Sequence, residues 1–300
     1  MVEPKAVSLD APDEAGTAPR PIVGFGTAVF SGAGYGLGGG SPDQLGMLIR
    51  AAIDRGVQYI DTSKDYGETE VCLGRLADVL AAHRVRICTK LVASDLSHGF
   101  NAILSRLRCE RVDTLLLHNG QHRDLLNADV VSALETAKHS GRFRLCGAST
   151  YGQLDATVAL SQPWCDVVQV EYSILNPSVV RALARRKRPG QEIVVRSVLA
   201  KGLLTERRTQ ATHLDPAAVE MLEQLTALAG TWGLTLPELA IRFALDTPGV
   251  DVVLLGLSSM AELGVALRAS LRKPLEPWQR EELRNFDRSD EDWVHPERWS

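Results

Sequence analysis

Two residues at a junction between an apolar run and a helical pattern have side chains suited to proton transfer. The stretch "YIDTSKDYGETEVCLGRL" (residues 59–76) places Asp61 at the end of the apolar run and Tyr66 five positions later. Two further apolar runs end near Lys90 and at His118. We therefore ask what a carboxylate, a phenol, an ammonium and an imidazole could do together.

These four groups fit the reduction of a carbonyl. A phenol has a pKa of about 10 and donates its proton poorly near neutrality. A neighbouring ammonium stabilises the phenolate and lowers that pKa, and a carboxylate holds the ammonium in place. A neutral imidazole can polarise a carbonyl or relay the proton. In this interpretation Tyr66 protonates the substrate oxygen while hydride arrives from a reduced cofactor.

Each residue taken alone has a simpler explanation. Asp61 could cap a turn or helix, Tyr66 could be a half-buried core aromatic, and His118 within "LLLHNG" could be a core histidine with its hydrogen bonds satisfied. Lys90 is the least easily explained, because a buried lysine at the end of an apolar strand needs a counter-charge. The choice depends on whether the fold brings the four together.

The chain alternates short apolar runs with amphipathic stretches. The runs are β-branched and continuously apolar, which is typical of strands buried on both faces. They cover residues 21–28, 57–61, 86–91, 113–119, 143–149, 166–172, 192–198 and 251–257. Helical patterns follow at residues 41–56, 68–82, 99–109, 127–140, 151–161, 177–188, 215–230, 236–246 and 259–270. Eight such units predict an α/β fold, the closed (β/α)₈ TIM barrel, with a doubly wound open sheet as the alternative.

The predicted barrel forms a single domain over residues 21–272. Residues 1–20 are expected to be a flexible leader, and residues 273–300 a tail that packs on the barrel. In a (β/α)₈ barrel the active site lies at the C-terminal rim, where the loops that follow the strands meet. Polar residues end every predicted strand from the second to the seventh, so they should gather at that rim.

Composition narrows the class of partner. The net charge of −4 and a pI of about 6.0 give no reason to expect nucleic acid or an anionic membrane as a partner. No run of apolar residues is long enough to span a membrane, and no signal-peptide pattern is present. The five cysteines are scattered, which favours reduced thiols in a cytoplasmic protein and no metal site. The expected partner is a small molecule, and the sequence does not indicate an oligomeric state.

At this point the sequence resembles the aldo-keto reductases. "IDTSKDYGETEVCLGRL", "ICTKL" and "DTLLLHN" are similar to the family's segments around its Asp, Tyr, Lys and His residues. The resemblance extends from about Ile22 to Ala269 and rests on six motifs in the family's order. It implies a (β/α)₈ oxidoreductase with the catalytic residues Asp61, Tyr66, Lys90 and His118, which uses NADH or NADPH.

The resemblance also implies where the cofactor binds. "GAST", "QVEYSIL", "VVRSVLAKGLL" and "LLGLSSMAEL" are similar to the segments that bind the nicotinamide amide, the pyrophosphate and the adenosine. The implied cofactor residues are Ser149, Thr150, Gln169, Arg196, Ser197, Leu199, Gly202, Gly256, Ser258, Ser259 and Glu262.

Two of these positions depart from the family pattern. Arg196 stands where many members place a Tyr against the nicotinamide, although a planar guanidinium can also stack. Gly256 and Glu262 stand where many members have a Lys and an Arg that bind the 2′-phosphate of NADPH. A carboxylate repels phosphate and accepts a hydrogen bond from a free 2′-hydroxyl. Glu262 therefore favours NADH, with Arg268 nearby as the alternative phosphate ligand.

The substrate is the least defined part of the prediction. "SGAGYGLGGG" (31–40) lacks the ending of a phosphate-binding loop and is read as a loop over the rim. It places Phe30 and Tyr35 as substrate contacts, together with Asn119 beyond the fourth strand. The loop resembles that of a subgroup associated with sugars and secondary metabolites, which favours a sugar-derived or secondary-metabolite aldehyde or ketone. The alternative to an enzyme is a cofactor-binding regulatory subunit or sensor of the same fold, with little turnover.

Overall fold

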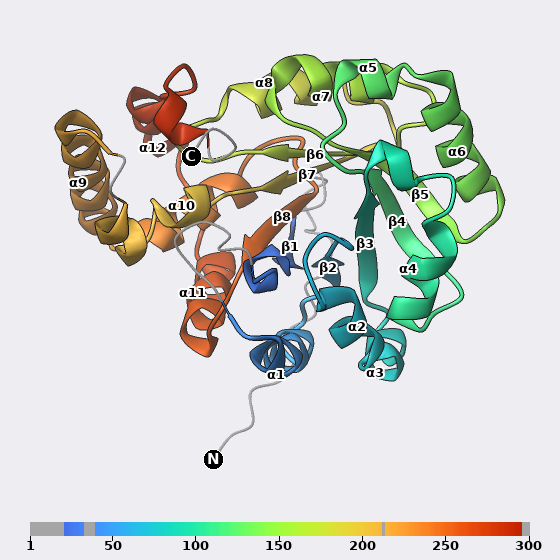
Figure 1. Ribbon diagram of the computed structural model, residues 1–300. Coiled ribbons are helices and arrows are strands. Elements are labelled where there is room, and N and C mark those ends of the chain that lie inside the picture. The colour runs from blue at the N-terminus through green and yellow to red at the C-terminus, as the bar shows by residue number, and fades with distance from the viewer. Residues whose placement is uncertain (1–20, 33–39, 212–213, 296–300) are drawn as a thin grey trace.

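The computed structural model describes residues 21–32, 40–211 and 214–295. Within these residues eight parallel strands close into a barrel in sequence order (Figure 1). The strands are β1 (Ile22–Gly26), β2 (Tyr59–Asp61), β3 (Arg86–Leu91), β4 (Val112–Leu117), β5 (Phe143–Ser149), β6 (Val167–Glu171), β7 (Glu192–Arg196) and β8 (Val252–Gly256). β8 pairs in parallel with β1 from Ile22 opposite Val252 to Gly26 opposite Gly256. This closure confirms the predicted barrel and excludes the doubly wound open sheet.

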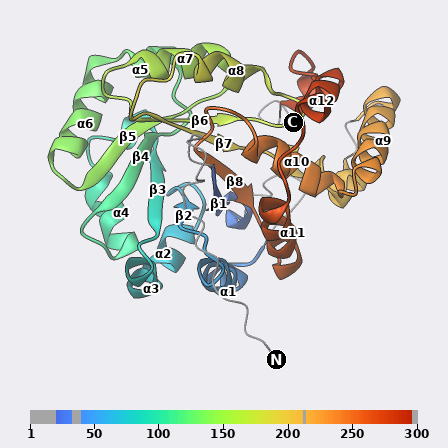
Figure 2. The ribbon, with the colours of Figure 1, turned by 180° about the vertical axis from the view of Figure 1, so that it is seen from behind.

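Helices surround the barrel, as Figures 1 and 2 show from opposite sides. They are α1 (Pro42–Ile53), α2 (Thr69–Gly74), α3 (Ala77–Ala82), α4 (Phe100–Leu107), α5 (His122–Leu125), α6 (Ala128–His139), α7 (Gly152–Ser161), α8 (Ser178–Ala184), α9 (Pro216–Thr231), α10 (Leu236–Leu245), α11 (Met260–Leu271) and α12 (Pro277–Glu282). Short 3₁₀ helices lie at Ala28–Phe30, Ala93–Asp95, Ala200–Gly202, Glu206–Gln210, Leu283–Phe286 and Asp292–Val294. No helix among the described residues is long and apolar enough to cross a membrane.

The helix starts follow the capping signals of the sequence. Ser41 and Thr235 cap α1 and α10 with reciprocal side-chain bonds, each followed by a proline within the first two helical positions. Asp215 caps α9 in the same position relative to Pro216. The single helix expected over residues 68–82 is wrong, since it is divided into α2 and α3. α2 ends at Gly74, where a Cβ atom would lie 2.0 Å from the carbonyl oxygen of Arg106, so the glycine permits close packing on α4.

The barrel interior is filled by side chains and not by solvent. One buried cluster takes a residue from most of the strands, namely Tyr59, Cys88, Leu116, Val167, Val194, Val252 and Leu254. These side chains fill the space between the strands, so the barrel has a packed core and is not a pore. In barrels of this kind the active site lies at the carboxyl end of the strands.

The described part of the tail packs against α8 and α10. Leu283, Phe286 and Val294 are buried, and Arg181 of α8 pairs with Asp287 at 2.8 Å. The backbone N–H of Arg288 also donates to the carbonyl oxygen of Leu175, at 2.8 Å. Figures 1 and 2 both place α12 beside this end of the chain, while α9 lies outside α10.

Candidate active site

Three of the four predicted catalytic residues meet at the carboxyl end of β2 and β3. Lys90 is fully buried, and its Nζ donates to Asp61 Oδ2 at 2.6 Å and to the Thr62 carbonyl oxygen at 2.9 Å. The same Nζ lies 3.4 Å from the Tyr66 hydroxyl and 4.9 Å from the centre of its ring. Burial disfavours the charge on Lys90, but the attractions of Asp61 and Tyr66 outweigh it and raise the pKa of Lys90. An ammonium held in this way stabilises negative charge on the Tyr66 oxygen.

His118 stands beside Tyr66 at the end of β4. Its backbone N–H donates to the carbonyl oxygen of Leu91 at 2.7 Å, and its ring meets that of Tyr66 edge to face, with 5.8 Å between ring centres. Ring atom Nδ1 lies 2.9 Å from Asp65 Oδ2 and 3.3 Å from Ser63 Oγ. Burial and the Lys90 charge lower the pKa of His118 to about 4, with Asp65 opposing the shift. The ring is therefore neutral near pH 7.

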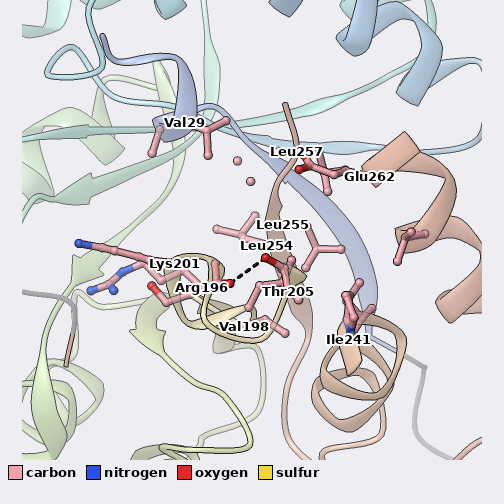
Figure 3. A pocket seen from close by; sticks show the side chains of 18 of the residues that line it. Val29, Arg196, Val198, Lys201, Thr205, Ile241, Leu254, Leu255, Leu257 and Glu262 are labelled. Carbon is pink, nitrogen blue, oxygen red and sulfur yellow. Dashed lines mark hydrogen bonds between the residues drawn. The ribbon is translucent and has the colours of Figure 1, made fainter. Parts of the chain in front are cut away.

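A cavity of about 410 Å³ opens from Tyr66 and Asp61 toward the start of α11. Its walls are largely apolar, and Figure 3 shows Leu254, Leu255 and Ile241 among them. Its polar lining includes Asp61 and Tyr66, and also Arg207 and Glu262 near the start of α11. A long apolar cavity with a few polar groups is the usual form of a cofactor site.

Six of the predicted cofactor residues line this cavity. They are Arg196, Ser197, Leu199, Gly202, Gly256 and Glu262. Gly256 allows Val29 to pack closely on the end of β8, because a Cβ atom there would lie 2.7 Å from Val29 Cγ1. The other five do not line it: Ser149, Thr150 and Gln169 are buried, Ser258 donates its backbone N–H to Glu262, and Ser259 caps α11.

A chain of hydrogen bonds connects two of the buried residues to the catalytic cluster. Ser149 Oγ donates to Gln169 Oε1 at 3.1 Å, and Gln169 Nε2 donates to Asp61 Oδ1 at 2.7 Å. Asp61 therefore accepts from Gln169 on one oxygen and from Lys90 on the other. Sequence reasoning placed Gln169 at the cofactor and did not foresee its bond to Asp61.

The residues of this site lie in a region of the chain that matches a known protein family. The model of the Aldo/keto reductase family matches residues 22–288. The chain belongs to the aldo/keto reductase family. As a member it is an NAD(P)-dependent oxidoreductase that interconverts carbonyls and alcohols.

Named relatives of this aldo-keto reductase include sugar dehydrogenases. It is 26% identical over 264 residues to L-galactose dehydrogenase of Arabidopsis thaliana, covering 80% of this chain and 81% of the relative. It is 25% identical to D-threo-aldose 1-dehydrogenase of a Pseudomonas species, covering 86% and 92%. The identity to D-arabinose 1-dehydrogenase of Saccharomyces cerevisiae is 28%, covering 73% and 74%.

Solved structures share the fold at lower identity. An aldo-keto reductase from Bacillus halodurans in its holo form superposes with a TM-score of 0.75 at 20% identity, covering 89% of this chain and 92% of that one. An aldo/keto reductase from Klebsiella pneumoniae in complex with NADP and acetate superposes with a TM-score of 0.69 at 20% identity, covering 90% and 93%. Both likenesses concern the fold.

Two structural features indicate that this aldo-keto reductase can hold a nicotinamide cofactor, namely buried hydroxyls without a partner and a strained backbone. Within the described part of the chain, the buried hydroxyl oxygens of Thr150 and Ser197 have no hydrogen-bond partner; Tyr59 and Thr114 share this property elsewhere, but Ser197 lines the cavity. Such atoms are rare in folded proteins unless a ligand or water satisfies them. The backbone of Ser197, Ala200 and Lys201 is also in the left-handed region, with φ of 58°, 46° and 49°. Strain of this kind is concentrated at ligand sites.

Arg196 makes a contact that the sequence did not predict. Its guanidinium stacks on the ring of Tyr151, with Cζ 4.1 Å from the ring centre, and its Nη2 donates to the Thr150 carbonyl oxygen at 2.8 Å. Tyr151 directly follows the "GAST" motif, but nothing in the sequence shows that its ring faces β7. Tyr151 therefore supports Arg196 at the cavity wall.

Glu262 has a cationic partner that the sequence analysis missed. Arg207 forms an ion pair with it, and the Arg207 Nη2 also donates to Ser258 Oγ at 2.9 Å. Glu262 Oε2 accepts from the backbone N–H of Ser258 at 2.6 Å. Arg268, the alternative phosphate ligand, instead lies 3.3 Å from Glu238 and does not line the cavity. The cation paired with Glu262 is Arg207, which lies 55 residues earlier in the sequence, in the 3₁₀ helix Glu206–Gln210.

The three predicted substrate contacts have different outcomes. Phe30 is 3% exposed and stacks on Phe25, so it belongs to the core and has little surface for a substrate. Tyr35 lies outside the described residues. Asn119 is exposed next to His118, with a left-handed backbone at a φ of 53°. Asn119 is thus the one of the three whose described position is open to a ligand.

Proposed function

We propose that this aldo-keto reductase interconverts a sugar-derived alcohol and its carbonyl, with Tyr66 as the proton donor and acceptor. The observation that carries the proposal is the buried Asp61–Lys90 pair beside the Tyr66 hydroxyl at the mouth of the cavity. A buried ammonium this close to a phenol is costly to build and needs its counter-charge. Its chemical use is to make proton exchange at the Tyr66 oxygen feasible near neutral pH.

The residues divide the work as follows. Tyr66 exchanges a proton with the substrate oxygen, Lys90 stabilises the phenolate, and Asp61 holds Lys90 in position. His118, whose ring stands beside that of Tyr66, contacts the substrate from the neighbouring side. A bound nicotinamide supplies or accepts the hydride. The full set of four groups at one rim supports turnover over a purely regulatory role.

The cofactor is proposed to lie along the cavity with its nicotinamide toward Tyr66. The unpartnered hydroxyl of Ser197 lines the cavity and would hold the cofactor near the nicotinamide, with buried Thr150 as a second contact, and the residues around Glu262 would hold the adenosine. We propose a preference for NADH, because the Glu262 carboxylate engages the guanidinium of Arg207. A 2′-phosphate would need Arg207 to leave that partner, whereas a 2′-hydroxyl would not.

The proposed substrate class rests on the relatives. The three sugar dehydrogenases named above are 25–28% identical to this chain and are covered over most of their lengths. We propose a sugar or sugar-derived substrate on this ground, in agreement with the resemblance of the loop after β1.

The substitution Tyr66→Phe tests the proposal, because it removes the hydroxyl and keeps the ring. Wild type and variant are screened with aldoses, alditols and simple aldehydes, with NAD⁺ or NADP⁺ and their reduced forms. We expect kcat to fall by about 10²–10⁴-fold, the usual contribution of a general acid or base, while cofactor affinity is unchanged. A variant that keeps more than about a tenth of wild-type kcat would remove Tyr66 from the chemistry.

A further inference from the structure

The hydrogen bond between Asp65 and His118 determines which ring nitrogen carries the proton. Asp65 Oδ2 lies 2.9 Å from His118 Nδ1, and a carboxylate oxygen can only accept. His118 must therefore donate through an Nδ1–H group. In a neutral imidazole with its proton on Nδ1, the other nitrogen, Nε2, carries a lone pair.

The second neighbour of Nδ1 does not reverse this assignment. Ser63 Oγ lies 3.3 Å from Nδ1, and a hydroxyl can donate or accept. If Ser63 donated to a bare Nδ1, the ring lone pair would face the Asp65 carboxylate at 2.9 Å, which is repulsive. Ser63 Oγ also accepts from the backbone N–H of Asp65 at 3.2 Å, so it helps to fix the carboxylate beside the ring.

The charges around His118 keep it neutral as well as oriented. Lys90 and Asp61 face it from β3 and β2, and Asp65 and Tyr66 face it from the loop after β2. Burial and Lys90 together outweigh the two carboxylates, which is why the pKa of His118 falls to about 4. Within the described residues, all hydrogen bonds of the ring are made by Nδ1, so Nε2 remains for a ligand.

We propose that Asp65 is a positioning residue that makes His118 Nε2 a hydrogen-bond acceptor, so that the site selects substrates with a hydroxyl next to the reacting carbon. The proposal rests on the proposed function. An acceptor cannot polarise a carbonyl oxygen, which is itself only an acceptor. The expectation that His118 polarises the carbonyl is replaced by a contact with a substrate O–H group.

The substrate hydroxyl that donates to His118 Nε2 cannot be the hydroxyl that reacts, because the reacting hydroxyl gives its proton to Tyr66. In the oxidative direction the reacting carbon loses hydride to the nicotinamide, the reacting O–H loses its proton to the Tyr66 phenolate, and the C=O bond forms. That O–H has a single hydrogen, so it cannot also donate to His118. The donor to Nε2 is therefore the hydroxyl of the adjacent carbon, and the substrate is a vicinal diol or lactol, or an α-hydroxy carbonyl in the reductive direction.

The tautomer can be measured without turnover. The chain has seven histidines, and His118 in ¹⁵N-histidine-labelled protein is identified by its loss in His118→Gln. We expect two-bond ¹H–¹⁵N spectra at pH 7 to show a protonated Nδ1 and a bare Nε2. Asp65→Asn, whose amide can donate or accept, should lose this fixed pattern, and Asp65→Glu should regain it. A wild-type ring protonated on Nε2 would overturn the proposal.

The substrate class is measured with a pair of aldoses that differ only in the 2-hydroxyl. Removing the hydroxyl should lower kcat/KM about tenfold in wild type, the size of one hydrogen bond, and clearly less in Asp65→Asn. The control Asp78→Asn makes the same charge change on the exposed face of α3 and should behave as wild type. An equal loss in wild type and Asp65→Asn would overturn the role of Asp65.

The two measurements separate this proposal from the proposed function. If no aldose or diol is turned over, but simple aldehydes are reduced through Tyr66, then the selection of a neighbouring hydroxyl is wrong while Tyr66 keeps its role. If Tyr66→Phe is fully active, the proposed function fails, and the spectra still decide the tautomer. Thermal unfolding of each variant confirms that it is folded before either measurement is interpreted.

Discussion

Replacing Lys90 by methionine should both destabilise the protein and abolish its chemistry, for separable reasons. The Lys90 side chain is fully buried, that of Asp61 is 6% exposed, and the two are 2.6 Å apart. Methionine keeps the apolar length of lysine and leaves Asp61 as a buried carboxylate without its cation. Breaking one partner of a buried pair costs about 3–5 kcal/mol. At roughly 2–4 °C per kcal/mol for a domain of this size, the Tm should fall by about 6–20 °C.

A double substitution separates the loss of catalytic activity from the loss of stability. In Asp61→Asn/Lys90→Met both charges are gone, and Gln169 can still donate to the new amide oxygen. Most of the lost stability should return, because removing both partners of a buried pair is often close to neutral. Activity should not return, since Tyr66 still lacks its ammonium. The control Lys187→Met breaks a pair with Asp251 whose side chains are 20% and 32% exposed, and it should cost about 1 kcal/mol or less.

The raised pKa of Lys90 also predicts how the stability contributed by the Asp61–Lys90 pair changes with pH. The pKa of Lys90 is raised above its ordinary value of 10.5, so the stability that the pair contributes is present below that pH and is lost only as the pH rises through the folded-state pKa. The difference between wild type and Lys90→Met should thus be constant from neutral pH to about pH 10. Thermal unfolding and pH–rate profiles measure the two effects. A Lys90→Met protein that melts within about 2 °C of wild type, or a double variant with near-normal kcat, would refute the reasoning.

Two further expectations concern other parts of the site. The pKa of His118 is about 4 in the folded protein and 6.5 ordinarily, so protonation at acid pH favours the unfolded chain. Between pH 7 and 4.5, the free energy of unfolding of wild type should therefore fall by about 2 kcal/mol relative to that of His118→Gln. Parallel pH–stability curves for the two proteins would contradict this. Glu262→Gln releases Arg207, so affinity for NADPH relative to NADH should rise by about fivefold at low salt and less at high salt. Quenching of tryptophan fluorescence measures both cofactors, with Arg207→Gln/Glu262→Gln as the control. Wild-type protein that already binds NADPH more tightly would contradict the NADH preference.

The barrel was predictable because its determinants are local. Buried parallel strands are short apolar runs, and the predicted bounds of β3 and β5 match the structure, at residues 86–91 and 143–149. α5 was missed because four residues are too few to show a helical period. The division between α2 and α3 was missed because it depends on the contact of Gly74 with α4, which lies thirty residues away in the sequence.

The candidate site was predictable only where it lies on strand ends. Closing the barrel brings Asp61, Lys90 and the histidine after β4 to one rim whatever the loops do, so their proximity follows from the fold. Asp65 lies in the loop after β2 and Arg207 in a short 3₁₀ helix after β7, and in both places the direction of a side chain depends on tertiary contacts. A carboxylate directly before Tyr66 was visible in the sequence, but its choice of His118 as partner was not. The catalytic and cofactor roles themselves stay predictions.

Asp61 joins the two halves of the proposed site. Lys90 donates to its Oδ2, Gln169 donates to its Oδ1, and Gln169 is in turn the acceptor of Ser149. Gln169 Nε2 has two N–H groups, so it could bind a ligand amide through the second one while it still donates to Asp61. Such a ligand would fix the Gln169 amide, and with it the donor that holds the Asp61 carboxylate beside Lys90. In the proposed site, binding at Ser149 and Gln169 would thereby be coupled, through a single buried carboxylate, to the ammonium beside Tyr66.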